Sequence, residues 1–273
     1  MNTARLAMVV TAVAVLAFGT ALVQADWFPN AADPLQSTNH KMHYPQMPDP
    51  FGWDVNFTEP KVLADDWMCS QSGFVDDIHL WFSHRQDVPL DMLMGLTATV
   101  AIYDNVPEDP ASGEPSKPGN PLWGPFQFVP RIILWPEDGE QGWYDPNLQE
   151  FEPQDHFNIY QMNIVGIGAD GTLDPFEQKE GEIYWLAVSV IEPTGTTEPL
   201  LGWKTTRDHF MDDAVFADMF PTSFDPELWR ELYVPPTFDE SLDLAFVITP
   251  EPATLALVGL GLAGLVMRRR RRR

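Results

Sequence analysis

Runs of alternating apolar and polar residues recur along this chain, and they favour a fold built from β-strands. In residues 74–84, the apolar side chains of Ile78, Leu80 and Phe82 fall on one face of an extended segment. Because successive side chains of a strand point to opposite faces, this period of two is typical of a strand with one face in a core. Similar runs predict further strands at 97–103, 126–135, 158–166, 182–191 and 242–248.

Proline and glycine interrupt these runs and leave little room for long helices. The chain has 26 prolines and 18 glycines, and residues 26–60 are expected to be irregular because prolines recur through them. Short helices are predicted only around 210–220 and 226–232, and long acidic loops are expected at 104–119, 137–155 and 169–181. Many strands joined by such turns predict an all-β fold. We expect an antiparallel β-sandwich of jelly-roll-like type over residues 61–249.

The N-terminus has the features of a secretory signal peptide. Arg5 precedes an apolar core at residues 6–18, and the small residues Val23 and Ala25 come before Asp26. This pattern predicts export through the secretion translocon and cleavage between Ala25 and Asp26, which removes residues 1–25. The alternative is an N-terminal anchor that is retained.

The C-terminus combines three features in residues 250–273. Pro250, Glu251 and Pro252 precede an uncharged apolar run at 253–267. The chain then closes with six arginines: Arg268, Arg269, Arg270, Arg271, Arg272 and Arg273. Such a cationic cluster stays on the cytoplasmic side of a membrane, so the preceding domain is expected outside.

The length of the apolar run leaves two interpretations of this tail open. As a helix it covers about 22 Å, against a hydrocarbon core of about 30 Å. The run is therefore marginal for a permanent transmembrane helix. It could be a plain tail anchor, or a sorting helix that holds the chain in the membrane until a protease cuts near Pro250.

The tripeptide, the apolar run, the arginines and their C-terminal position together resemble the PEP-CTERM sorting signal of bacterial exosortase systems. The resemblance covers residues 250–273. It implies recognition and removal of the tail by an exosortase, an integral-membrane cysteine protease. It also implies a host with an outer membrane and exopolysaccharide.

The region between the two terminal segments is strongly acidic. Seven of the 16 basic residues and one of the 40 acidic residues lie in those segments, so residues 26–249 hold 9 bases and 39 acids, a formal charge of −30. Such a field repels nucleic acid, keeps the domain soluble and gathers cations. Nucleic acid is therefore excluded as a partner.

Several segments of this region are similar to exported bacterial β-sandwich domains that carry PEP-type tails. The resemblance rests on the following segments: 63–69, 75–81, 181–186, 202–205, 208–215 and 242–249. It implies the fold and the exported location. That group is uncharacterised, so no catalytic residue is carried over.

The residues favour a protein that is not an enzyme. The histidines show no metal-binding spacing, and no nucleophile elbow or phosphate-binding glycine loop is present. Cys69 is the single cysteine, so no intramolecular disulfide forms, and it is expected to be a small buried apolar residue. A secreted hydrolase with an unrecognised pair of carboxylates remains an alternative.

No cofactor is expected, with one exception for a structural ion. Asp170 and Asp174 flank a short Gly-Thr-Leu loop and offer the hard oxygen ligands that Ca²⁺ prefers. The loop lacks the full EF-hand pattern, so these residues predict at most a structural Ca²⁺ site. Solvated turns are the alternative.

The aromatic residues give a second functional hypothesis. Ten tryptophans are many for this length, and Trp123, Trp143 and Tyr144 are expected in or beside loops, where their rings could stack on sugars. We therefore predict an exported, non-enzymatic protein of the cell surface or extracellular matrix, of structural or binding type. A carbohydrate-binding module that recognises exopolysaccharide is the main alternative.

Overall fold

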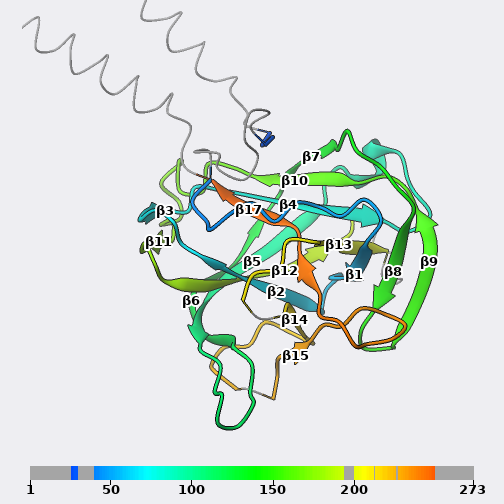
Figure 1. Cartoon of the computed structure of the whole chain (residues 1–273). Helices are drawn as coiled ribbons and strands as arrows, with labels where there is room; N and C mark the ends of the chain where they lie inside the picture. The colour runs from blue at the N-terminus through cyan, green and yellow to red at the C-terminus, as the bar shows by residue number, and fades with distance from the viewer. Residues whose placement is uncertain (1–25, 30–39, 194–199, 212, 226, 250–273) are drawn as a thin grey trace, which may run out of the picture. The chain divides into compact units, whose positions relative to one another are not determined.

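The alternating segments form β-strands that gather into two principal sheets (Figure 1). The computed structural model describes residues 26–29, 40–193, 200–211, 213–225 and 227–249, and from Trp27 onward they belong to one unit. Within these residues there is a nine-stranded sheet, a six-stranded sheet and a two-stranded sheet, and the helical content is one 3₁₀ turn, η1 (Leu90–Leu93). The predicted all-β sandwich is confirmed.

The nine-stranded sheet is mostly antiparallel. Its strands are β1 (Trp53–Asn56), β4 (Asp77–His84), β7 (Arg131–Leu134), β8 (Gln141–Asp145), β9 (Glu150–His156), β10 (Tyr160–Ile164), β13 (Leu201–Thr206), β16 (Asp243–Leu244) and β17 (Phe246–Thr249). The order is β7-β10-β4-β13-β1-β8-β9, with β16 beside β13 and β17 beside β4. β1 and β8 run parallel, and the strands from β2 to β7, which belong to both principal sheets and the small ribbon, separate them in sequence.

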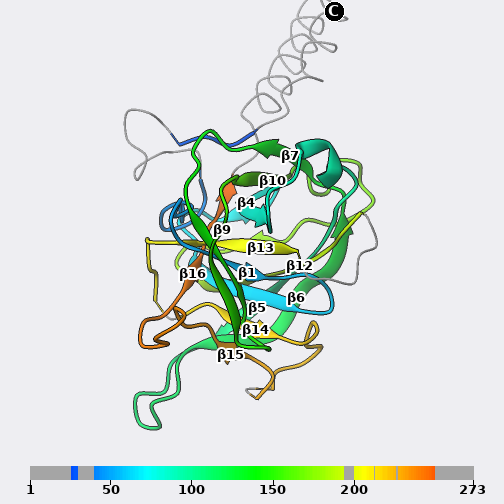
Figure 2. The same ribbon diagram turned by 90° about the vertical axis from the view of Figure 1, so that its right-hand side faces the viewer.

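The six-stranded sheet is antiparallel throughout its described length. Its strands are β2 (Val62–Met68), β5 (Thr97–Val106), β6 (Lys117–Phe128), β12 (Ile183–Ile191), β14 (Val215–Ala217) and β15 (Arg230–Glu231). The order is β15-β14-β2-β12-β5-β6, so β6 and β15 are its edges. A small ribbon of β3 (Gly73–Phe74) and β11 (Glu177–Gln178) completes the strands. Figure 2 shows the two principal sheets from the side.

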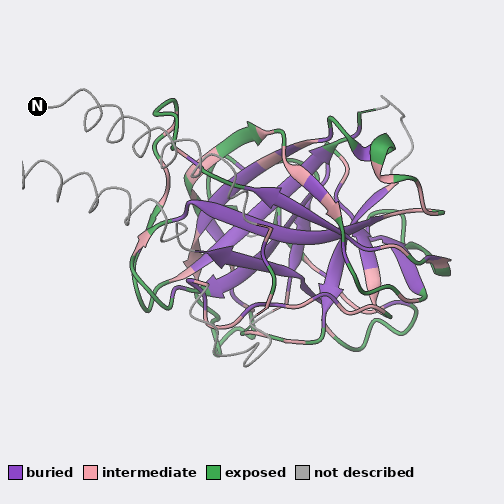
Figure 3. Ribbon diagram, turned by 90° about the horizontal axis from the view of Figure 1, so that it is seen from above, coloured by how far each residue is buried: buried purple, intermediate pink, exposed green. Residues whose placement is uncertain are grey.

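The core lies between the two sheets, and both of their inner faces supply it. Trp67 of β2 contacts Phe246 of β17 edge to face, with ring centroids 6.3 Å apart. A buried polar contact also joins the layers, since the Leu244 backbone N–H donates to the Asp65 carboxylate over 2.6 Å. Figure 3 shows the strands buried along most of their length and the connecting loops exposed.

Both outer faces are also covered, which explains why many polar strand residues are buried. Trp229 packs edge to face on Tyr103 and covers the outer face of the six-stranded sheet. On the nine-stranded sheet, Trp27 packs on Trp81, which in turn packs on Trp135. Gln161 of β10 donates to the Trp27 carbonyl over 2.8 Å and fixes this N-terminal residue in place.

The predicted strands all appear, but four local expectations are wrong. The segment 210–220 contains β14 in place of the expected helix, because residues 215–217 pair with β2 through backbone hydrogen bonds. The described part of 226–232 likewise forms β15 and no helix. The expected loop 137–155 is the β8–β9 hairpin, and the expected irregular segment 26–60 contains β1.

Candidate functional site

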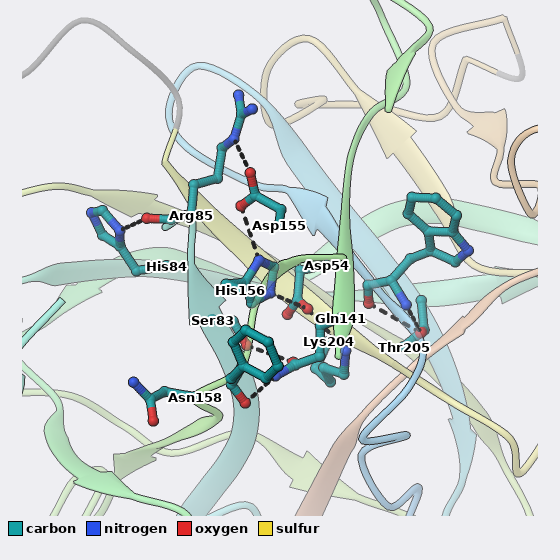
Figure 4. A network of polar contacts seen from close by, with 12 residues as sticks. Asp54, Ser83, His84, Arg85, Gln141, Asp155, His156, Asn158, Lys204 and Thr205 are labelled. Carbon is teal, nitrogen blue, oxygen red and sulfur yellow. Dashed lines mark hydrogen bonds and ion pairs between the residues drawn. The ribbon is translucent and has the colours of Figure 1, made fainter. Parts of the chain in front are cut away.

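A row of charged side chains crosses the outer face of the nine-stranded sheet (Figure 4). Asp54 of β1 and Lys204 of β13 are cross-strand neighbours, and the Lys204 ammonium lies 2.9 Å from the Asp54 carboxylate. His156, at the end of β9, places Nε2 2.9 Å from the same carboxylate and Nδ1 3.1 Å from Asp155. Arg85 is the last member of this row, at the surface, with its Nε 3.5 Å from Asp155. We call these five residues the buried ionic network.

The network fixes the protonation of His156. Burial lowers the pKa of this imidazole, but the charge of Asp54 and hydrogen bonds to Asp155 and Asp54 outweigh it and raise the pKa to about 9. The Asp54 pKa moves the opposite way: burial raises it, and the charges of Lys204 and His156 bring it below its usual value. His156 is therefore a cation at neutral pH, with both ring nitrogens donating to carboxylates.

This arrangement does not form a nucleophilic triad. Ser83 lies nearby in Figure 4, but its hydroxyl donates to Gln141 over 2.9 Å and not to His156. The side chains of Asp54, His156 and Lys204 have no exposed surface. Cys69 is equally unsuited to attack a substrate, because burial raises the pKa of its thiol and the thiol donates to the Gln71 carbonyl. The network therefore acts within the fold.

An open surface groove of about 800 Å³ lies between the β5–β6 connection and residues 224–233. We call it the β15 groove. Its charged lining consists of four carboxylates and two cations: Asp109, Glu114, Glu227, Glu231, Lys117 and Arg230. Both cations already have acidic partners. Lys117 lies 3.4 Å from Glu114, and Arg230 lies 3.0 Å from Asp218.

Aromatic side chains also line the β15 groove. Phe224 and Tyr233 line it, and Trp229 is buried beneath it. The Tyr233 hydroxyl donates to Glu231 over 2.5 Å, and this hydrogen bond raises the Tyr233 pKa to about 12. The hydroxyl therefore stays protonated. An open trough with hydrogen-bond donors, acceptors and ring faces can bind a ligand rich in hydroxyl groups.

The structure corrects the placement of two predicted sugar contacts. Trp143 and Tyr144 lie on β8, where they are 2% and 4% exposed, and the Arg85 guanidinium covers the Trp143 ring at 5.2 Å. Their rings are unavailable to a ligand, because the strand is covered on both faces. Trp123 lies on β6 and is half-buried, with Phe128 stacked on its ring and Phe126 against its edge.

The predicted calcium ligands lie in an exposed turn. The Asp170 carboxylate accepts hydrogen bonds from the Thr172 amide and hydroxyl, at 2.9 and 2.7 Å. The Asp174 backbone carbonyl accepts a hydrogen bond from the Trp123 indole. The described residues contain no group of three or more acidic, histidine or cysteine side chains placed to hold a metal ion. A Ca²⁺ site here remains a prediction.

The sorting and processing residues lie mainly outside the described residues. These are Ala25, the tripeptide Pro250, Glu251 and Pro252, the predicted sorting helix, and the arginines from Arg268 to Arg273. Asp26 is the first residue that the structure describes. In the part of the chain that the structure covers, no helix has the length and apolarity that a membrane crossing requires.

Neither the buried ionic network nor the β15 groove could be singled out from the sequence. Asp54 falls in a segment expected to be irregular, and His156 has no partner within reach along the chain except its neighbour Asp155. The one available signal was Lys204, a lysine between Trp203 and Thr205 in a strand-forming run. A charge in such a place requires a buried partner.

Comparison with known families identifies both parts of the chain. A model for a domain of unknown function, DUF7901, matches residues 42–249, and the PEP-CTERM protein-sorting motif matches residues 249–272. No curated protein matches the chain. The motif match confirms the predicted sorting signal. It implies export, anchoring of the C-terminus in the membrane before processing, and processing by an exosortase.

Proposed function

The chain belongs to the DUF7901 family, and from its exosortase-sorted tail and its β15 groove we propose that the mature domain is a non-enzymatic glycan-binding protein of the cell surface or extracellular matrix. The groove carries this proposal. Its position at the end of the sandwich leaves it open to long, chain-like ligands.

The chemistry of the β15 groove favours a polyhydroxylated ligand. Sugar hydroxyls both donate and accept hydrogen bonds: carboxylates such as Glu227 accept them, and the Lys117 ammonium has donors beyond its contact with Glu114. The ring faces of Phe224 and Tyr233 can pack against the C–H faces of a pyranose. An apolar small molecule is a poor match, because most of the lining side chains are polar or charged.

The charge balance narrows the class of glycan. Four carboxylates face two cations in the groove, and each cation already has an acidic neighbour. A uronic-acid polymer would bring further negative charge to this surface and to a domain of formal charge −30. The groove therefore favours neutral or amine-bearing glycans.

The absence of catalysis is part of the proposal, and the buried ionic network supports it. Its imidazole and carboxylates would be natural acid–base groups, but they are enclosed and engaged with one another. In the groove, hydrogen bonds from Ala111 and Ser112 hold the Asp109 pKa below its usual value, which makes Asp109 a poor general acid.

Binding of oligosaccharides to the mature domain, residues 26–249, tests the proposal. Calorimetry is run with a neutral glucan, an amino-sugar oligomer and an oligouronate. We expect binding to the first two and at least roughly tenfold weaker binding to the third, in line with a charge penalty of about 1.4 kcal/mol. Release of new reducing ends from any of them would instead favour a hydrolase.

Two double variants locate the binding surface. Phe224→Ala with Tyr233→Ala removes the rings of the groove and is expected to weaken binding about tenfold or more. Trp123→Ala with Phe126→Ala removes the aromatic patch on β6 and serves as the matched control. Loss of binding only in the control pair would move the site to β6, and no binding by the unmodified domain would contradict the proposal.

A further inference from the structure

Both ends of the described domain meet on the same strand. Trp27, two residues after the predicted cleavage site, packs on Trp81 of β4 with ring centroids 5.9 Å apart. At the other end, the Thr249 hydroxyl lies 3.2 Å from Nε2 of His79, also on β4. His79 and Trp81 are two residues apart and share a face, which places them about 7 Å apart. The chain thus enters and leaves the domain at nearly one place.

The connection from this place to the membrane segment is short. Thr249 pairs with Asp77 and is 5% exposed, so the fold holds the chain up to this residue. The apolar run begins at Ala253, four residues later. Even fully extended, four residues reach only about 14 Å. The polar layer on each side of a bilayer is about 5–8 Å thick, so the domain cannot stand far from the lipid.

The surface around the two ends suits contact with lipid headgroups. Exposed apolar side chains lie in the N-terminal segment, at the end of β7 and just after β6 and β10: Phe28, Leu134, Val129 and Val165 are 47%, 53%, 74% and 37% exposed. Phe28 stacks on Trp135, next to Leu134. Aromatic and aliphatic side chains of this kind favour the interface between water and bilayer. We call this the exit face.

We propose that the exit face lies against the membrane surface in the precursor whose tail is still in the bilayer. Figures 1 and 2 place β7 and β10 at one end of the sandwich and β14 and β15 at the other. The β15 groove is then directed away from the membrane before the tail is cut. The precursor stands on the bilayer in a single orientation, set by the short connection after Thr249.

Fluorescence quenching in vesicles tests this orientation on the full chain. Cysteines introduced singly as Leu134→Cys and Val165→Cys mark the exit face. Leu148→Cys and Met219→Cys mark exposed control positions at the far end, where Asn147 contacts Asp218. Cys69 is 1% exposed, so the fluorophore reacts with the introduced thiols. Lipids with a nitroxide on the headgroup act as quenchers.

We expect quenching at Leu134→Cys and Val165→Cys to exceed that at Leu148→Cys and Met219→Cys by about threefold or more. A Gly-Ser spacer of some twenty residues between Thr249 and Pro250 should abolish this difference, while the chain still floats with the vesicles. Equal quenching at all four positions without the spacer would overturn the proposal. If the exit-face positions are still quenched more strongly when the spacer is present, the short connection is not what sets the orientation.

Discussion

His156 lies between two carboxylates, so its proton is part of the fold. Its pKa is raised from 6.5 to about 9, and the protonated form therefore stabilises the native state. This contribution is complete below pH 6.5 and is lost as the pH rises through about 9. We expect the free energy of unfolding to fall by up to about 3 kcal/mol across this window, measured by urea titration at each pH.

Two substitutions separate this effect from the general titration of the domain. His156→Gln removes the proton and should flatten the dependence between pH 6.5 and 9. His84→Gln is the control, because burial lowers the pKa of half-buried His84 and keeps its titration below the window. An unchanged slope in His156→Gln would contradict the assignment.

Lys204 gives a second prediction at this scale. Its ammonium has no exposed surface and lies 2.9 Å from Asp54. Lys204→Met keeps the volume of the side chain but leaves Asp54 with His156 as its remaining cationic partner in the network. We expect a loss of about 1.5–3 kcal/mol, because the buried Asp54 carboxylate loses one of its two charge-assisted hydrogen bonds. Urea denaturation measures it, and the double variant Asp54→Asn with Lys204→Met should recover part of the loss.

At the scale of elements, one edge strand of each principal sheet has features that disfavour pairing with other chains. The edge strand β6 contains Pro118, Pro121 and Pro125, which cannot donate a backbone hydrogen bond. The edge strand β9 carries Glu150, Glu152 and a proline. These features keep the domain from extending its sheets by association.

Replacement of two edge prolines tests this protection. Pro118→Thr with Pro121→Thr restores backbone donors on β6 and should make the domain associate as its concentration rises. Light scattering from 1 µM to about 100 µM follows the effect, and Pro153→Thr on the acidic edge β9 is the comparison. A variant of β6 that stays monomeric over this range would show that the prolines are not the barrier.

The same elements show which parts of the fold can be predicted from sequence. β4 was predictable because its apolar side chains follow the strand period, and β12 because both of its faces are apolar, as in a central strand. β8 and β13 were not, because all their residues are buried and polar ones such as Gln141 and Lys204 interrupt the pattern. The buried charge of Lys204 is neutralised by Asp54, which is 150 residues away in the sequence, and local sequence patterns cannot identify such a distant partner. The β15 groove was hidden for the same reason, since tertiary pairing placed Val215–Ala217 and Arg230–Glu231 in strands.

At the scale of the whole molecule, the negative charge opposes the compact state. The domain between the terminal segments has a formal charge of −30. Salt screens this repulsion, so we expect the melting temperature to rise with NaCl and to level off at about 0.5 M, where the Debye length is only a few Å. Scanning calorimetry on residues 26–249 provides the measurement, and a melting temperature that falls with salt would contradict it.

Divalent ions test the calcium prediction on the same domain. At matched ionic strength, Ca²⁺ should raise the melting temperature more than Mg²⁺ if Asp170 and Asp174 help to hold an ion. The variant Asp170→Asn with Asp174→Asn should then lose the difference. Equal effects of the two ions would mean that screening alone acts.

The solitary thiol of Cys69 has a practical consequence for how the protein matures. It is buried, its pKa is raised, and it donates to Gln71. The domain needs no oxidant after translocation, because a single cysteine cannot form an intramolecular disulfide. The mature form should accumulate to the same level in cells that lack periplasmic oxidoreductases or that are grown with a reductant, so its yield reports on secretion and sorting alone.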